Sequence, residues 1–190
     1  MTDQQPSASI FQLVDHEIFL ITTAYENERS GFIATWVMPA SIQKGTPRIA
    51  LMSSPLNYSH SLIEKSKKMV IHLLSRPQAP LLEKFGIISG KDHDKFQGVP
   101  LDLIHQIPVI QGTCGWARTQ VDNIFDIGER CIVIANVLEQ RTYPERTPLR
   151  KKAAFADLPK AVQKKLAEKH QHLAQQSAHI WPIDNKPPLG

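Results

Sequence analysis

The chain has 190 residues, of which 42% are hydrophobic, and this composition suits one globular domain with a sizeable core. It contains no run of about 18 apolar residues, and its first residues lack the basic and apolar regions of a signal peptide. We therefore expect a cytoplasmic protein with no membrane partner. Cys114 and Cys131 lack the spacing of a metal or redox motif and are expected to be buried free thiols.

The net charge of +4 is unevenly distributed along the chain. Residues 1–140 carry 12 Lys or Arg and 14 Asp or Glu, whereas residues 141–190 carry 10 and 4. The basic character therefore belongs to the tail. Such a patch is more often a solvated helix face or a subunit contact than a nucleic-acid site, so we expect no nucleic-acid partner.

In the first half of the chain, β-branched and aromatic runs between turn residues predict four strands, and helical spacing predicts two short helices. Asn57 or Ser59 would cap the first helix. The strands are expected at residues 17–26, 31–38, 47–54 and 69–74, and the helices within 57–68 and 79–87.

In the second half, residues 89–102 lack periodicity and predict a surface loop, and two long strands follow at 108–121 and 130–140. The strand at 130–140 is apolar on both faces, which indicates that a helix or a second subunit covers its outer face. Residues 141–152 predict an extended basic connection. A helix at 157–180 then begins at Asp157 and carries one narrow apolar stripe of Leu158, Val162, Leu166, Leu173 and Ile180.

These elements predict a mainly β (α+β) protein built on a small antiparallel barrel, with short helices and a C-terminal helix. Residues 1–140 would form the barrel domain. Residues 141–190 would pack on the barrel or on a partner subunit.

The familiar catalytic patterns are missing from the sequence. The potential ligands in the stretches KDHDK and HQH point in different directions at their spacings, so no metal site is predicted. No nucleophile elbow, dinucleotide fingerprint or Walker sequence is present.

What remains is a cluster of hydroxyl, imidazole and indole groups at Thr35, Trp36, Ser41, Ser59, His60 and Ser61. Hydroxyls beside free N–H groups at a helix start can bind phosphate without a glycine-rich loop. Helix capping alone would explain the same residues. Trp36 would be either core packing or a pocket wall, whereas Trp116 and His72 are expected to be structural.

The ordered set GFIATWVMPASI, PRIALMSS, YSHSLIEKSKKMVIHLL, LLEKFGIISGKDHDKF and IGERCIVIANVLE resembles the flavin reductase-like family of FMN-binding split β-barrels. It is similar above all to the branch with an Ala-Ser-Trp signature, matched here by Ala34-Thr35-Trp36. The likeness covers residues 15–140.

This resemblance implies a homodimer with FMN near the subunit interface. The flavin ring would lie along the backbone of Ile33, Ala34, Thr35 and Trp36, and Thr35, Ser41 and Ser59 would hold its phosphate. The resemblance also implies an NAD(P)H-dependent flavin reductase in which hydride passes from the nicotinamide to flavin N5. The full set of predicted cofactor-binding residues is Ile33, Ala34, Thr35, Trp36, Ser41, Ser59, His60, Ser61 and Arg130; no catalytic side chain is assigned.

The sequence departs from the family at three places. Asn57 and Tyr58 replace a basic residue before the helix, His72 replaces an Asn, and Glu129-Arg130 replaces an Asp-His turn. Lys91, Lys95 or a tail residue of the partner subunit would then supply charge for the phosphate. Arg130 is a candidate for the flavin N1–C2 edge or a surface charge.

The departures leave three alternatives to the reductase. The protein could be an electron-transfer flavoprotein reduced by a protein partner, or a non-catalytic FMN-binding member. The third alternative is a binding module that uses the basic tail.

Overall fold

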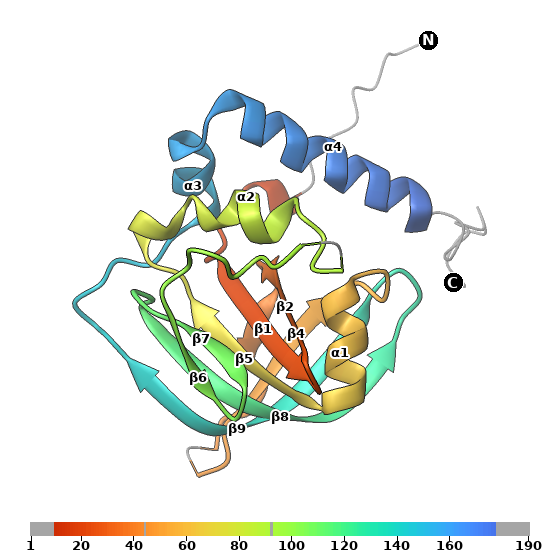
Figure 1. Ribbon diagram of the computed structural model, residues 1–190, viewed down its shortest axis with the longest axis vertical. Coiled ribbons are helices and arrows are strands. Elements are labelled where there is room, and N and C mark those ends of the chain that lie inside the picture. The colour runs from red at the N-terminus through yellow and green to blue at the C-terminus, as the bar shows by residue number, and fades with distance from the viewer. Residues whose placement is uncertain (1–9, 44, 92, 178–190) are drawn as a thin grey trace.

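The computed structural model describes residues 10–43, 45–91 and 93–177 as a curled antiparallel sheet with one group of helices packed over part of it and a further helix beside it (Figure 1). The seven-stranded sheet has the order β2-β1-β5-β8-β9-β4-β3, and β6 pairs with β7 in a separate hairpin. The strands are β1 Phe19–Tyr25, β2 Glu28–Ala34, β3 Val37–Pro39, β4 Arg48–Ser53, β5 Lys68–Leu73, β6 Leu101–Ile104, β7 Ile107–Ile110, β8 Gly115–Asp126 and β9 Cys131–Thr142. The helices are α1 Tyr58–Ser66, α2 Leu81–Gly86, α3 Lys151–Asp157 and α4 Lys160–Ser177, with 3-10 turns at Ile10–Gln12 and Arg76–Gln78.

The two edge strands of the large sheet, β2 and β3, follow each other directly in the chain. Only Thr35 and Trp36 separate them. The Cα atoms of Ala34 and Val37 are three residue steps apart and can lie at most about 11 Å from each other, so the sheet must curl until its edges lie close together. The result is an antiparallel barrel that is split between β2 and β3. The split-barrel fold class expected from the resemblance is confirmed.

The barrel interior holds an apolar core to which alternate residues of the strands contribute their side chains. On β1, Ile21 points inward, and Val133 and Ala135 do the same on β9. Helix α1 inserts Ile63 into this cluster, and Leu51 completes it from β4. The period of two along each strand therefore separates an inner face from an outer face.

The outer face of β1 carries a second core, formed with the helices. Leu20 packs with Phe85 of α2, Ala154 of α3 and Val162 of α4. Helices α2, α3 and α4 lie together above β1 (Figure 1). The C-terminal helices thus pack on the barrel of their own chain. None of the described helices is both long and apolar enough to cross a membrane.

The bounds of several predicted elements differ from the structure. The strand expected at 31–38 is two strands, because the chain crosses from one sheet edge to the other at Thr35 and Trp36. The strand expected at 108–121 is also two, and the end of the predicted loop at 89–102 begins the β6–β7 hairpin. The extended connection at 141–152 was wrong at both ends, since β9 continues to Thr142 and α3 starts at Lys151.

The predicted C-terminal helix begins at Lys160 instead of Asp157, which ends α3. Of its predicted apolar stripe, Leu158 and Val162 are buried and Leu166 packs against them. Ile180 lies outside the described residues. Both cysteines are buried free thiols, as predicted.

His72 is a fully buried side chain that ties three strands together. Its Nδ1 lies 2.9 Å from the Leu20 carbonyl oxygen on β1, and its Nε2 accepts from the Ile110 N–H on β7 at 3.1 Å. Nε2 is the acceptor, so the ring is neutral and Nδ1 carries the proton. Burial lowers the pKa of His72 to about 4. The prediction of a structural role for His72 is confirmed.

The depressed pKa of His72 makes stability depend on pH. The unfolded chain binds a proton at this ring below about pH 6.5, whereas the folded chain does so only near its pKa of about 4. Stability is complete above pH 6.5 and should fall by about 3 kcal/mol as the pH drops to 4. Urea unfolding of the wild type and of His72→Gln at both pH values measures this, and the variant should lose correspondingly less. Parallel losses in the two proteins would contradict the assignment, as would an imidazolium signal from His72 at pH 5 by NMR.

Candidate functional site

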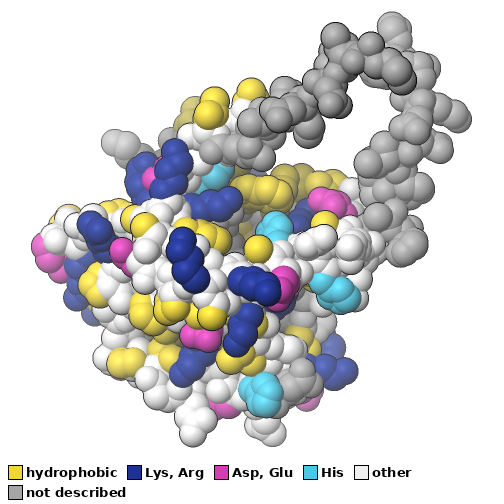
Figure 2. All heavy atoms as spheres, turned by 90° about the horizontal axis from the view of Figure 1, so that it is seen from above, with side chains coloured by type: hydrophobic (Ala, Val, Ile, Leu, Met, Phe, Trp, Pro, Cys, Tyr) yellow, Lys and Arg dark blue, Asp and Glu magenta, His cyan; other side chains and the backbone are white. Residues whose placement is uncertain are grey.

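A cavity of about 620 Å³ lies where the split between β2 and β3 meets the start of α1 and the helices α2 and α4. Its size falls in the range of small-molecule sites, about 300–1,000 Å³. Figure 2 shows the helical face of the molecule from above, with Lys and Arg side chains spread over it. Residues far apart in the chain, from Ile18 to Leu173, contribute to the lining.

The first wall of the cavity is the chain crossing between the two sheet edges. Ile33, Ala34, Thr35 and Trp36 all line it. The Trp36 carbonyl accepts from the Met52 N–H at 3.0 Å, which fixes the crossing to β4. The Trp36 side chain is 45% exposed and is therefore not part of a core. This part of the strand offers backbone and an indole to a ligand.

The second wall is the beginning of α1, where Asn57, Tyr58 and Ser59 line the cavity. Asn57 is the N-cap residue and its side chain makes no capping hydrogen bond. The first N–H groups of a helix have no acceptor within the helix, and they favour an anion nearby. The Ser59 hydroxyl shares a buried hydrogen bond of 2.8 Å with the Ser30 hydroxyl.

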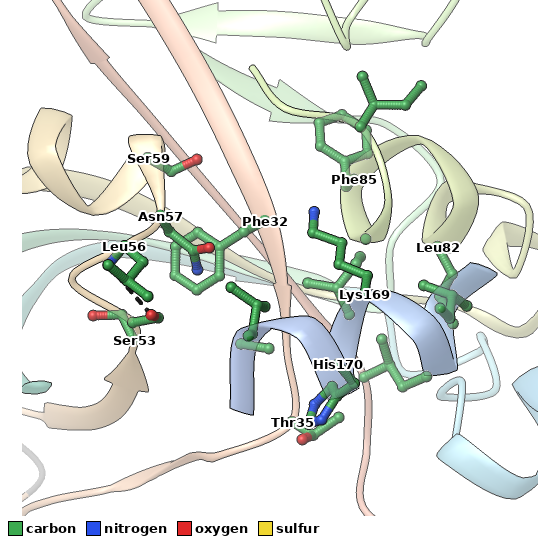
Figure 3. A pocket seen from close by; sticks show the side chains of 18 of the residues that line it. Phe32, Thr35, Ser53, Leu56, Asn57, Ser59, Leu82, Phe85, Lys169 and His170 are labelled. Carbon is green, nitrogen blue, oxygen red and sulfur yellow. Dashed lines mark hydrogen bonds between the residues drawn. The ribbon is translucent and has the colours of Figure 1, made fainter. Parts of the chain in front are cut away.

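The third wall is apolar and comes from the helices. Leu82, Phe85 and Gly86 of α2 lie here with Leu166 of α4 (Figure 3). A Cβ at Gly86 would approach the Leu166 Cδ2 to 2.8 Å, so this glycine lets α4 pack closely on α2. An apolar wall of this kind suits a flat aromatic ring.

Gly31 explains part of the run of small residues at the start of the second predicted strand. A Cβ there would lie 2.7 Å from the Ile21 carbonyl oxygen and 3.3 Å from the Phe85 ring. The Gly31 carbonyl also accepts from Lys95 Nζ at 2.8 Å. Gly31 is therefore small mainly because the Ile21 carbonyl of β1 lies against it, and also because Phe85 of α2 packs on it. Gly31 does not line the cavity.

Among the residues that the structure describes, the titratable side chains that line the cavity are Lys, Arg and His, with no Asp or Glu. These residues are Lys95, Arg130, Lys151, Lys169 and His170. Burial, reinforced by the charge of Lys169, lowers the pKa of Lys95 to about 8, and burial also lowers the pKa of Lys169. The pKa of His170 is lowered by burial and then by Arg130 and Lys151. Because its lowered pKa leaves His170 uncharged at neutral pH, the positive charge comes from the three lysines and Arg130. The Arg130 Nε also lies 4.0 Å from a Glu129 carboxylate oxygen, and the remaining positive charge favours an anionic ligand.

Arg130 connects the basic groups to the strand crossing. Its guanidinium carbon lies 5.9 Å from the centroid of the Trp36 ring, a cation–π contact. Its side chain is only 19% exposed, so it is not the free surface charge that was the alternative. Arg130 and Trp36 together form the end of the cavity nearest β9.

The structure brings six of the nine predicted site residues to the cavity and leaves three outside. Those inside are Ile33, Ala34, Thr35, Trp36, Ser59 and Arg130, and those outside are Ser41, His60 and Ser61. The Ser41 hydroxyl joins the Thr46 carbonyl and the Arg48 N–H within the β3–β4 loop.

The two residues after Ser59 turn away from the cavity because successive helical residues point about 100° apart. The His60 side chain is 1% exposed, and its Nδ1 lies 2.7 Å from the Ser53 hydroxyl oxygen. The Ser61 hydroxyl donates to the Tyr58 carbonyl at 2.8 Å, a local bond of the first helical turn.

Tail residues of the same chain line the cavity, whereas the sequence had suggested a tail residue of the partner subunit. Lys169 and His170 of α4 lie at the cavity, and Lys169 reaches into it (Figure 3). Lys95 was considered as a source of positive charge and lines the cavity, whereas Lys91 does not. The spacing of histidine and lysine residues in α4 did not predict a role in the cavity, because the packing of α4 on β1 and α2 decides which face of the helix covers the site.

The chain matches known proteins over most of its length. Residues 11–152 match the family model described as flavin reductase like domain. Among curated proteins it is 26% identical to a high molecular weight rubredoxin of Moorella thermoacetica, over 70% of this chain and 58% of that protein. It is 28% identical to an NADH:FMN oxidoreductase of Rhodococcus qingshengii, over 56% of this chain and 54% of that protein. The matches thus cover little more than half of these relatives.

Solved structures share the fold. An FMN-binding protein from Thermus thermophilus has a TM-score of 0.67 and 18% identity, with 80% of this chain and 92% of that chain covered. An NADH:FAD oxidoreductase from Streptomyces globisporus C-1027 has a TM-score of 0.67 and 16% identity, with 72% and 81% covered. The split barrel, the cavity at its seam and the match over residues 11–152 together show that this chain belongs to the flavin reductase-like domain family.

Proposed function

We propose that the protein binds FMN in this cavity and catalyses its reduction by NAD(P)H. The observation that carries the proposal is the cavity itself, which joins exposed backbone and indole at Thr35 and Trp36 to an exclusively basic set of charged side chains. Exposed strand backbone and an indole suit the flat flavin ring, and basic side chains suit its phosphate ester.

The residues present fit FMN at both ends of the cavity. Ile33 to Trp36 would lie along the ring, with Phe85 and Leu82 as its apolar surroundings. Ser59 and the first N–H groups of α1 would bind the phosphate. When bound, the flavin supplies the hydride-accepting chemistry, and the protein supplies position and charge. Arg130 would place positive charge where a reduced ring becomes anionic.

The choice of NAD(P)H as electron donor is supported by two relatives. One curated relative is named an NADH:FMN oxidoreductase, and one solved structure with a similar fold is named an NADH:FAD oxidoreductase. The Glu129-Arg130 turn, together with the similarity to a protein named a rubredoxin, favours a second candidate, an electron carrier reduced by a protein partner.

Absorbance spectroscopy distinguishes these functions. The purified protein is expected to bind FMN stoichiometrically, with a shifted visible spectrum after gel filtration. Addition of NADH or NADPH under anaerobic conditions should then bleach the flavin. A protein that binds FMN but is bleached by neither nicotinamide would be the electron carrier, and failure to bind FMN would refute the proposal.

Trp36 offers the most direct test of the cavity. We expect Trp36→Ala to weaken FMN binding about tenfold, because an aromatic contact of about 1 kcal/mol and part of the apolar area are lost. Trp36 is half exposed, so the melting temperature should change little. Fluorescence titration measures the affinity, with Trp116→Phe as a control at a buried indole. Unchanged FMN affinity in Trp36→Ala would place the ring elsewhere.

We propose further that the protein is a homodimer joined through an outer apolar face of the sheet. This face consists of Met38, Ala50, Met52, Phe125, Ile132 and Ile134, which lie in register across β3, β4, β9 and β8. Met38 is 58% and Phe125 53% exposed. The helices α2 to α4 cover the other side, over β1. Met52 belongs both to this face and to the cavity lining, so a partner here would adjoin the site.

The dimer is tested by placing a charge on this face. Phe125→Lys should shift the protein from dimer to monomer in light scattering at micromolar concentration, because a lysine in an apolar interface loses its hydration. Leu103→Lys, at an equally exposed leucine of the separate β6–β7 hairpin, is the matched control and should remain a dimer. A wild type that is monomeric, or a dimeric Phe125→Lys, would contradict the proposed interface.

A further inference from the structure

We propose that the C-terminal helix α4 is part of the ligand site, and that its Lys169 acts with Lys95 to bind the phosphate of the flavin. This inference rests on the proposed binding of FMN. It adds a specificity-determining residue from a helix that lies beyond residues 11–152, the part matched by the family model.

The two lysines occupy similar positions at the cavity. Lys95 Nζ donates to the Gly31 carbonyl at 2.8 Å, and Lys169 Nζ donates to the Ile87 carbonyl at 2.9 Å. Each ammonium group has three donors, so each retains donors for a ligand. Neither forms an ion pair within the described part of the chain. A Lys95 side chain that is only 6% exposed, without a carboxylate, favours an anionic ligand as its counter-charge.

Lys95 lies close to the residues at the start of α1. A Cβ added at Gly90 would overlap the Ser30 hydroxyl and lie 3.4 Å from Lys95 Cε, so these three residues adjoin one another. The Ser30 hydroxyl is in turn bonded to that of Ser59 at 2.8 Å. Lys95 thus borders the same end of the cavity as the N-terminus of α1, and the two features would act on one phosphate.

Helix α4 is held firmly enough to place Lys169. Its Val162 is buried in the outer core, and Leu166 contacts Gly86. The Gln163 amide donates to the carbonyls of Phe155 and Leu158 at 2.7 and 2.8 Å. One turn after Leu166, Lys169 extends from α4 into the cavity (Figure 3). The packing of the helix therefore sets the position of this charge.

Paired titrations of FMN and riboflavin test the inference, because riboflavin has the same ring without the phosphate. Lys169→Met should weaken FMN binding by about tenfold or more, the usual effect of losing a charge-assisted hydrogen bond, and change riboflavin binding less than about twofold. Lys169→Arg should restore most of the FMN affinity. Lys165→Met removes the same charge from an exposed position of α4 outside the lining and should bind FMN as the wild type does.

The outcomes separate this inference from the proposed function. Wild type that binds neither FMN nor riboflavin would refute the function. If the wild type binds FMN and Lys169→Met binds it equally well, only the role of Lys169 is refuted. Equal losses for FMN and riboflavin would also refute it, because α4 would then act as a structural cover. Circular dichroism and melting temperature establish that each variant is folded.

Discussion

The structure depends on one geometric constraint, that two residues connect opposite edges of a seven-stranded sheet. Thr35 and Trp36 cannot span a flat sheet, so the strands must curl until β2 and β3 meet. A sheet closed in this way leaves a seam where backbone is not committed to a ladder. The cavity lies at this seam, which is why strand backbone and an exposed indole can be offered to a ligand at the surface of a barrel.

Side chains pack against both faces of strand β1, and this strand therefore links the barrel to the helices. Ile21 belongs to the inner core, whereas Leu20 belongs to the core beneath α2, α3 and α4. His72 bonds to the Leu20 carbonyl and so joins the same strand to β5 and β7. The cavity walls from α2 and α4 are therefore attached to the strand that also organises the barrel.

The uneven charge of the sequence has a counterpart in the cavity. Residues 1–140 have more acidic than basic side chains, yet the charged residues that line the cavity are all basic. Lys151, Lys169 and His170 come from the tail, where the positive charge is concentrated. The tail thus adds two lysine charges and a neutral imidazole to a site whose backbone and hydroxyls come from the barrel.

Most of the strands, the family and the stretch from Ile33 to Trp36 could be predicted from the sequence, because they depend on local periodicity and on an ordered set of motifs. The breaks within residues 31–38 and 108–121 could not, since they depend on where the sheet closes. The sequence also identified Ser59 and Arg130 as site residues. It could not separate Ser59 from its neighbours His60 and Ser61, since their directions depend on how α1 is rotated against the barrel. Nor could it explain Gly31, where a side chain would collide with the Ile21 carbonyl of the paired strand and press on Phe85, a residue 54 positions later. That α4 covers its own barrel and directs Lys169 into the cavity became visible in the folded chain alone, because it depends on the long-range packing of Val162 and Leu166, which no local pattern encodes.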